Sequence, residues 1–420
     1  MALTVIVIAV LAVLPRAKLP STGQEPVHFA LSKACASTES GTLVAGSTRG
    51  EVSLRGTSGQ TGTSDQTGTS PVSQPLAAGT TMITPRDAQA SVVGGVFGST
   101  RATSGATNWF SPCAEARTDQ LLLFPGGAAT LLMTNPGATD AVASITLTGP
   151  QGNIGAPELR DVTVPAGATV SINLDSHVGH VAQAGVRIRT TRGQLSAVVR
   201  SGQVTGVDYQ GATTLSRDST VAAIPAGADR VTLLLSNPDT VRTSARLSVL
   251  GQSGPFDPGN GSIVVEAEST IAVDLPASVS VEAAAVRVAA RSNIAVSAVI
   301  TKGADIALLA AQPTSSTVPT TAMAALPAAG QLIVSNVDEE PVNVTVDWGA
   351  DQAATTRMIP AGSSIQLTTP QNVELVRISG DGRLVAGAEI AQAGLSLVTA
   401  QSVPGEGTSA VARPAVELGR

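Results

Sequence analysis

Residues 131–140 read LLMTNPGATD, and nearly the same phrase returns as LLLSNPDTVR at 233–242 and LIVSNVDEEP at 332–341. Each copy is an apolar run that ends at an asparagine, and the three asparagines recur at intervals of about one hundred residues. Such a run is typical of a β-strand entering a turn, because an asparagine side chain bonds its own backbone at a strand end. The phrase therefore predicts one β unit used three times, with Asn135, Asn237 and Asn336 as its structural anchors.

A second motif also recurs once in each of the three copies. An arginine stands between two apolar residues at Arg187, Arg287 and Arg377. Because side chains alternate across a strand, we expect each arginine on the solvent face of its strand. There it would pair with a neighbouring carboxylate or discourage edge pairing, and a stripe of cations for an acidic polymer is the alternative.

The segments between these landmarks alternate apolar and polar residues with period two, as in VSINL at 170–174. Six or seven such strands in about one hundred residues, separated by turn signals, are typical of a β-sandwich. A repeat of this length can bury a core of its own, so each copy is expected to be a domain. The alanine-rich stretches AAIPAG at 222–227 and AALPAAG at 324–330 are interpreted as linkers.

The sequence therefore predicts an all-β chain of tandem domains. We expect an N-terminal signal or anchor segment at 1–19, an N-terminal β domain at 20–118 with a low-complexity loop at 56–70, and three β-sandwich repeats at 119–221, 222–323 and 324–420.

The composition of the chain limits the kinds of core and of binding partner that it can have. Aromatic residues make up 2% of the chain, so the cores must be built from Val, Leu, Ile and Ala. The formal net charge of −6 argues against a nucleic-acid partner, which would require clustered Lys and Arg.

The apolar run LTVIVIAVLAVL at 3–14 has the length of the apolar region of an export signal, although no basic residue precedes it. A buried strand or helix is the alternative. The two cysteines, Cys35 and Cys113, are a disulfide candidate in an exported protein, and two unpaired buried thiols are the alternative.

No motif predicts a catalytic, cofactor or metal site. Asp175, His177 and His180 could ligate a metal, but the other repeats do not keep them, so a solvated loop is the preferred interpretation. Glu266 and Glu268 lie two apart on an expected strand and are interpreted as surface residues.

Two further features bear on ligands. The segment 257–261 (DPGNG) is oxygen-rich but lacks the ligand spacing of calcium loops, so a tight turn is expected. Trp109, Trp348 and Tyr209 are the rings that a sugar site could use, and for Trp348 a core position is preferred to an exposed contact.

The segments PVHFALSKAC at 26–35, WFSPC at 109–113 and 131–152, with VPAG at 164–167, together resemble an exported or membrane-anchored actinobacterial protein family of unknown function. The resemblance covers roughly residues 20–400 and implies immunoglobulin-like repeats and an extracytoplasmic location. It implies no catalytic residues and no cofactor.

From these observations we expect a non-enzymatic structural or interaction protein of the cell envelope, on the outer side of the membrane or secreted, which displays tandem β-sandwich domains. Its partner would be an envelope protein or polysaccharide, and its N-terminal segment would contact the membrane. An accessory module for envelope polysaccharide is one alternative. An enzyme with an inter-domain site is another, and a pocket that joins polar residues of two units would favour it.

Overall fold

The computed structural model describes residues 32–56, 66–87, 90–102, 105–179, 181–202, 206–314, 321–349, 352–390 and 394–403. In this part of the chain the expected all-β class is confirmed: nearly all regular structure is strand, with a one-turn helix α2 (Asp175–Val178) and two short 3-10 helices, η1 (Pro157–Leu159) and η2 (Ala277–Ser280). The expected anchor segment at 1–19 and the end of the chain after 403 lie outside the described residues.

The strands form four units, which we call the N-terminal unit (33–115) and repeats 1 (119–211), 2 (216–313) and 3 (321–402). The N-terminal unit contains β1 (Lys33–Ser37), β2 (Gly41–Ser47), β3 (Glu51–Gly56), β4 (Gln66–Thr69), β5 (Val72–Leu76), β6 (Gly79–Pro85), β7 (Val92–Ala102), β8 (Gly105–Pro112) and β9 (Ala114–Glu115). Repeat 1 contains β10 (Asp119–Pro125), β11 (Ala128–Thr134), β12 (Ala141–Gly149), β13 (Gly152–Ile154), β14 (Val162–Val164), β15 (Thr169–Asn173), β16 (Gln183–Arg192), β17 (Ser196–Gly202) and β18 (Val207–Gly211).

The other two repeats follow the same plan. Repeat 2 contains β19 (Ser216–Ile224), β20 (Arg230–Asn237), β21 (Thr243–Gly251), β22 (Gly254–Phe256), β23 (Ser262–Val265), β24 (Ser269–Asp274), β25 (Ala284–Lys302), β26 (Asp305–Ala310) and β27 (Gln312–Pro313). Repeat 3 contains β28 (Thr321–Ala325), β29 (Gly330–Asn336), β30 (Val342–Asp347), β31 (Thr355–Ile359), β32 (Ser364–Thr368), β33 (Leu375–Gly380), β34 (Leu384–Ile390), β35 (Leu397–Thr399) and β36 (Gln401–Ser402).

All four units share one strand order in two antiparallel sheets. In the N-terminal unit one sheet runs β4-β3-β6-β1-β9 and the other β5-β2-β7-β8, and repeat 3 repeats both orders as β31-β30-β33-β28-β36 and β32-β29-β34-β35. Repeats 1 and 2 each add one short strand to this order, β13 beside β12 and β22 beside β21, and in repeat 2 the long strand β25 serves both sheets. The N-terminal unit is therefore a fourth copy of the unit that the asparagine phrase marks three times.

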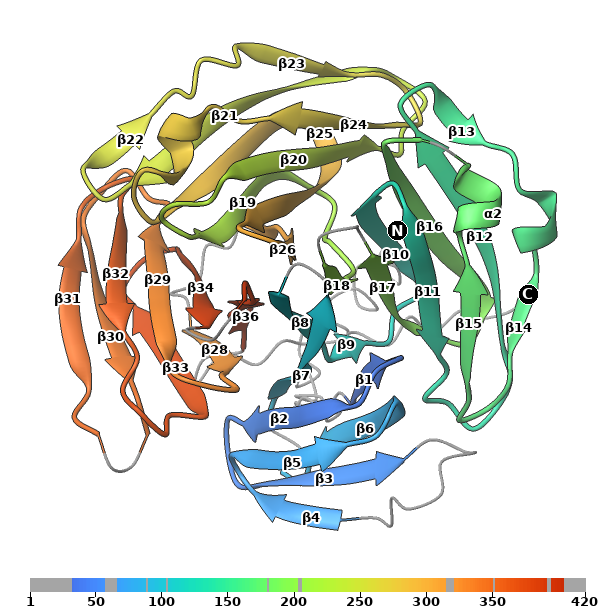
Figure 1. The fold of residues 1–420 in the computed structure, drawn as a ribbon, viewed down its shortest axis with the longest axis horizontal. Coiled ribbons are helices and arrows are strands. Elements are labelled where there is room, and N and C mark those ends of the chain that lie inside the picture. Colours follow the sequence, from blue (N-terminus) through green and yellow to red (C-terminus); the bar gives the residue numbers. More distant parts are fainter. Residues whose placement is uncertain are drawn as a thin grey trace, which may run out of the picture.

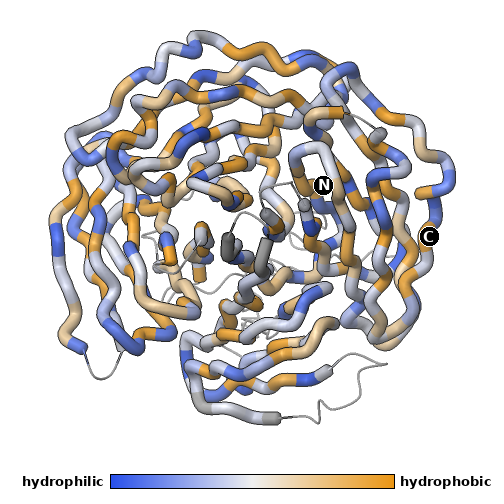
Figure 2. The backbone as a smooth tube through the Cα atoms, in the orientation of Figure 1, coloured by the Kyte–Doolittle hydropathy of each residue, from blue (hydrophilic) through white to orange (hydrophobic). Residues whose placement is uncertain are grey.

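Apolar residues on one side of each sheet fill the space between the two sheets of a unit. Figure 2 shows the alternation of hydrophobic and hydrophilic positions along the strands. In repeat 2, for example, Leu233 and Leu235 of β20 pack with Val286 and Val288 of β25 in one core cluster. The four cores are built almost entirely from aliphatic side chains, as the low aromatic content predicts.

The four units close into a ring (Figure 1). Neighbouring units meet through apolar outer faces, and we call each of these contacts a seam. Leu121 and Leu123 of repeat 1 meet Leu234 of repeat 2, while Ala222 of repeat 2 meets Ile333 of repeat 3. These faces are the second buried side of each sheet, so most strands are covered on both faces.

The seam between repeat 3 and the N-terminal unit closes the ring, and we call it the closing seam. Met323 and Ala325 of β28 pack there against Val44 of β2 and Val93 of β7. The remaining seam joins the N-terminal unit to repeat 1, where Leu132 enters the core cluster of the N-terminal unit. A row of domains joined by linkers, as the sequence predicted, is wrong for this chain.

The linker interpretation fails because the alanine-rich stretches continue strands. The boundary expected between 221 and 222 falls within β19, and that between 323 and 324 falls within β28. Ala222 and Ala223 are buried in a seam. Small side chains at these positions let two sheets approach closely, and this packing role explains a composition that resembles a linker.

The low-complexity loop expected at 56–70 is also partly wrong. Its last residues form β4, which pairs with β3 in the register Glu51↔Thr69 to Leu54↔Gln66. Backbone hydrogen bonding does not depend on side-chain complexity, so this polar stretch can extend a sheet. Residues 57–65 of the same loop lie outside the described part of the chain.

Candidate functional site

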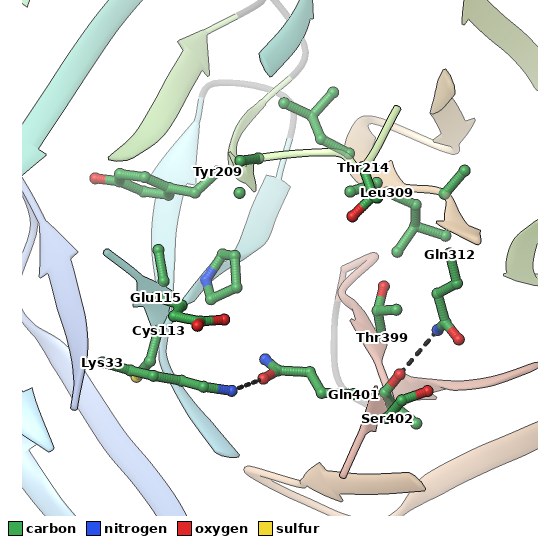
Figure 3. Close-up of a pocket in the computed structure, with 18 of the residues that line it drawn as sticks. Lys33, Cys113, Glu115, Tyr209, Thr214, Leu309, Gln312, Thr399, Gln401 and Ser402 are labelled. Carbon is green, nitrogen blue, oxygen red and sulfur yellow. Dashed lines mark hydrogen bonds between the residues drawn. The ribbon is translucent and has the colours of Figure 1, made fainter. Parts of the chain in front are cut away.

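A cavity of about 330 Å³ lies on the axis of the ring, where all four units contribute lining residues. Strands from the last part of each unit converge there, and Figure 1 shows β8, β18, β26 and β36 at the centre of the ring. The lining includes Lys33 and Glu115 of the N-terminal unit, Tyr209 of repeat 1, Gln312 of repeat 2 and Gln401 of repeat 3. Figure 3 shows these side chains around one space.

Two buried aspartates fasten the central strands to one another. Asp208 of β18 accepts backbone N–H groups from Phe110 of β8 at 2.8 Å and from Leu308 of β26 at 2.7 Å. Its two carboxylate oxygens therefore join repeat 1 to the N-terminal unit and to repeat 2.

Asp305 of β26 makes the matching contacts on the other side. Its Oδ2 accepts the backbone N–H of Asn108 in β8 and that of Leu395 in repeat 3, both at 2.8 Å. Together Asp208 and Asp305 connect all four units at the axis. β8 and β26 lie at the edges of their sheets, so these buried acceptors satisfy N–H groups that no neighbouring strand reaches.

Both aspartates are nearly inaccessible to solvent, and this changes their titration. Burial raises the pKa of Asp208 well above its usual range, against the backbone N–H groups that lower it, and the charge of Asp305 raises it further. Burial also raises the pKa of Asp305. The two carboxyl groups thus hold protons at higher pH than exposed aspartates do.

Lys33 extends from β1 into the cavity (Figure 3), and its ammonium group donates a hydrogen bond to Oε1 of Gln401 in repeat 3. Burial lowers the pKa of Lys33 to about 8, the nearby Glu115 opposes this shift, and Arg117 adds to it. Glu115 itself pairs with Arg117 at 3.2 Å, and both of these side chains are partly exposed. The ammonium group of Lys33 therefore faces the cavity with a neutral amide as its hydrogen-bond partner.

The rest of the cavity wall is mixed. Leu308, Leu309 and Leu397 supply apolar surface, and Thr214 and Thr399 supply hydroxyl groups. Gln312 is held in the wall because its amide donates to the carbonyl oxygens of Ala386 at 3.1 Å and Ala400 at 2.8 Å. The arrangement can accommodate a small molecule with both a polar and an apolar part.

Cys35 and Cys113 form a disulfide with an S–S distance of 1.99 Å, and Cys113 contributes to the cavity wall. The bond joins β1 to the end of β8, which belong to different sheets of the N-terminal unit. It therefore fixes the strand that carries Lys33 relative to the end of β8, which also lines the cavity.

The three anchor asparagines are not among the residues that line the cavity, and they make one recurring network. Each is buried, its Oδ1 accepts the backbone N–H of the residue two positions on, and its Nδ2 donates to the carbonyl oxygen four positions on. The bonds to the N–H groups of Gly137, Asp239 and Asp338 measure 2.9, 3.1 and 2.8 Å. The bonds to Thr139, Val241 and Glu340 measure 2.8, 2.9 and 2.7 Å. These residues hold turns and have no role at the cavity.

The three recurrent arginines lie on the outer faces of their sheets, and two of them, Arg287 and Arg377, contact a neighbouring unit. Arg187 forms a two-bond ion pair with Asp119, and Arg287 does the same with Asp218. Arg287 also reaches the carbonyl oxygen of Val337 in repeat 3 at 3.4 Å, and Arg377 donates to a carbonyl oxygen of the N-terminal unit. Arg187 and Arg287 thus pair with a carboxylate of a neighbouring strand, as expected. Arg287 and Arg377 also face a neighbouring unit, because alternation identifies the outer face of a sheet and does not say what covers it.

Of the candidate metal ligands, His177 lies in α2 and its Nδ1 contacts Glu158 at 2.8 Å. Asp175 accepts the backbone N–H of Ala129 at 2.6 Å, and His180 lies outside the described residues. Within the described ranges, no three His, Cys, Asp or Glu side chains gather as a metal site would require.

Glu266 and Glu268 do not lie on a strand, contrary to expectation. They form the exposed turn between β23 and β24, and Glu268 has a φ of +50°. Gly167 and Gly362 occupy the matching turns with φ of +64° and +60°. Repeat 2 thus keeps the turn and places a residue with a side chain where the other repeats have glycine.

The segment 257–261 is a tight turn as expected, since Oδ1 of Asp257 accepts the backbone N–H of Gly259 at 2.7 Å. Trp348 is buried in the core of repeat 3, and its Nε1 donates to Thr355 at 3.0 Å. Trp109 and Tyr209 are also buried, with ring centroids 5.4 Å apart. None of these three rings is a free stacking platform.

Sequence reasoning missed Lys33, Gln401, Asp208 and Asp305. Asp208 stands in the short strand VDYQG, whose three central residues are buried and where an unpaired charge is costly. No local pattern distinguishes Lys33 or Gln401, since the cavity forms only when strands 368 residues apart come together.

Among the helices in the described part of the chain, none has the length and apolar character needed to cross a membrane. The fold and the site define an all-β ring of four two-sheet units around an axial cavity. The chain belongs to the family of unknown function DUF5719, whose model matches residues 97–370, more than half of the sequence. The expected membership of a family of unknown function is confirmed. No curated protein matches the chain.

Proposed function

We propose that this protein is a non-enzymatic structural or interaction protein of the cell envelope, located on the outer side of the membrane or secreted. Its units would be immunoglobulin-like sandwiches in the broad sense, tethered through the N-terminal apolar segment. The resemblance to exported or membrane-anchored actinobacterial proteins supports this location.

The observation that carries the proposal is the closed ring, whose units pack through apolar seams and whose N-terminal unit holds a disulfide. Disulfides persist in oxidising compartments and are rare in the cytosol. A ring whose units pack through continuous apolar faces moves as one body, because separating two units would expose that surface to water. The protein would therefore present a fixed arrangement of surfaces to its partner, and would do so as a disc and not as an extended spacer.

The test has two parts in cells that produce the protein. A thiol-reactive polymer added to denatured cell extracts should leave the wild-type chain unshifted and should shift the Cys35→Ser variant by one label, since Cys113 is then free. Crosslinking of intact cells, followed by purification, should recover an envelope protein or polysaccharide. Free thiols in the wild-type chain together with its recovery in the cytosolic fraction would overturn the proposal.

An enzyme with a site between units is the second candidate, because the axial cavity joins polar residues of four units. Incubating the full chain with extracts of cell metabolites and following consumption by mass spectrometry tests it. Turnover that is lost in Lys33→Met and in Glu115→Gln would favour the enzyme. An accessory module that binds polysaccharide by stacking sugars on aromatic rings is not advanced, since the three rings named above are buried.

A further inference from the structure

We propose that the axial cavity is a binding site for a small organic anion with one negative charge, a monocarboxylate with an apolar body, whose carboxylate pairs with the ammonium group of Lys33.

The charge of the cavity wall supports this assignment. The ionised side chains in the lining are Lys33, Arg117 and Glu115, two cations and one anion, while the whole chain has a formal net charge of −6. Glu115 is already engaged by Arg117 at 3.2 Å. The wall thus has one positive charge in excess inside an acidic protein, and one carboxylate would neutralise it.

The other lysine in the described part of the chain, Lys302, has a charged partner. Lys302 links repeat 2 to repeat 3 through the carboxylate of Glu389 at 2.6 Å. Lys33 links the N-terminal unit to repeat 3 in a similar way, but its partner Gln401 is a neutral amide. The nearest carboxylate to Lys33, that of Glu115, is shared with Arg117, and the hydrogen-bond partner of the ammonium group is an amide. A half-buried ammonium group in this position would gain a counter-ion of its own from a ligand carboxylate.

The size and the walls of the cavity define the remainder of the ligand. A volume of about 330 Å³ is at the lower end of small-molecule pockets, which hold roughly 300–1,000 Å³. Leu308, Leu309 and Leu397 offer contacts for an apolar body. A short-chain or medium-chain carboxylate fits these features, whereas a ligand with several negative charges would meet the carboxylate of Glu115 with no further cation to balance it.

The site spans the contact that closes the ring. Lys33 comes from the N-terminal unit and Gln401 from repeat 3, so a ligand bound between them contacts both sides. A ligand that binds the closed ring better than the open or unfolded chain stabilises the closed form by mass action. Anion binding should therefore raise the thermal midpoint of the full chain as well as produce heat on mixing.

The experiment titrates the full chain with hexanoate and octanoate by calorimetry, with 1-octanol as the uncharged control of equal chain length. Lys33→Met removes the cation, and Gln401→Glu supplies an internal carboxylate to Lys33 while it preserves the shape of the side chain. Lys302→Met is the matched control, because it removes a lysine that links two units away from the cavity.

The expected result is saturable binding of one carboxylate per chain, at least tenfold tighter than the binding of 1-octanol. Affinity should fall at least tenfold in Lys33→Met and in Gln401→Glu and should stay within twofold in Lys302→Met. If Lys33→Met does not fold, Gln401→Glu alone decides the question. Absence of saturable binding by the wild-type chain, equal binding of 1-octanol, or unchanged affinity in Gln401→Glu would each overturn the proposal.

Discussion

Nη2 of Arg377 donates a hydrogen bond to the carbonyl oxygen of Thr48 at 2.7 Å, although the two residues are 329 positions apart. Arg287 makes the matching contact one seam earlier, with the carbonyl oxygen of Val337. Val337 follows the anchor Asn336, and Thr48 follows Ser47, which ends β2 as Asn336 ends β29. In repeats 2 and 3 the arginine therefore contacts the strand end of the next unit, and at the closing seam this contact joins repeat 3 to the N-terminal unit.

Replacing Arg377 by Met should lower the free energy of unfolding by about 2 kcal/mol, because a hydrogen bond from a charged group is lost and the carbonyl group of Thr48 is left in a covered seam. Urea denaturation measures this. Arg357→Met is the matched control, since Arg357 is exposed and donates only to its neighbour Thr356 among the described residues. A loss of equal size in the two variants would show that the seam contact contributes nothing specific.

The sequence was sufficient to predict the strands but not to predict how the units pack into a ring. Alternation and the asparagine phrase predict β11, β20 and β29 with their turns, because both signals are local. The sequence did not identify the N-terminal unit as a fourth copy of the repeat, because Ser47 stands at the strand end where the repeats have asparagine. The hydroxyl group of Ser47 donates to the carbonyl oxygen of Arg49. Ring closure depends on Met323 meeting Val44, and no local pattern identifies the surface that covers an outer face.

The candidate site was harder to predict from the sequence than the fold was. Cys35 and Cys113 could be proposed as a pair because an exported chain with two cysteines has few alternatives. The cavity could not be proposed, since its wall takes residues from four units. The linker interpretation failed for a related reason. The small side chain of alanine suits both a tight seam and a linker, so composition does not distinguish the two.

Glu268→Gly should stabilise the protein by about 0.5–1 kcal/mol, because glycine adopts a positive φ without the steric cost that a side chain carries, and this gain exceeds the added entropy of the unfolded chain. The backbone bond from residue 268 to the carbonyl oxygen of Asp239 at 3.0 Å is retained. Thermal and urea unfolding measure the change.

The reverse substitution is the control for this turn. Gly362→Ala should destabilise by about 1 kcal/mol or more, since Gly362 has a φ of +60° and an added Cβ would lie 3.0 Å from Cγ of Pro255. Effects of the same sign in Glu268→Gly and Gly362→Ala would refute the equivalence of the two turns.

The stability of the protein should rise with pH between 8 and 9.5 through Lys33. The pKa of Lys33 is about 8 in the folded chain, and its ordinary value is 10.5. In this window the unfolded chain holds a proton that the folded chain has released, so raising the pH favours the folded state. The whole pKa shift of Lys33 corresponds to at most about 3 kcal/mol in the free energy of unfolding. The charges of Glu115 and Arg117 each change a part of this shift.

Urea denaturation at pH 7.5 and 9.5 measures this difference, and the wild-type chain is compared with Lys33→Met and Lys302→Met. The rise should disappear in Lys33→Met and persist in Lys302→Met. Burial raises the pKa of Tyr209, whose opposite effect begins only above pH 10 and stays outside the window. An equal rise in Lys33→Met would assign the effect to another group.

Loss of the disulfide should destabilise the protein by about 2–4 kcal/mol, because the bond joins residues 78 positions apart and restricts the unfolded chain. The double variant Cys35→Ala/Cys113→Ala and the reduced wild-type chain should give the same value in urea. If reduction leaves the midpoint of unfolding unchanged, the bond does not form in solution or does not constrain the fold.

Small-angle X-ray scattering of the full chain tests ring closure most directly, because closure decides the overall dimension of the molecule. A closed ring should give a radius of gyration near the value for a compact chain of this length, about 22 Å, and the Arg377→Met variant should remain close to it. A radius of gyration roughly twice as large, with the long maximum dimension of a row of four domains, would contradict the closed ring and with it the axial cavity.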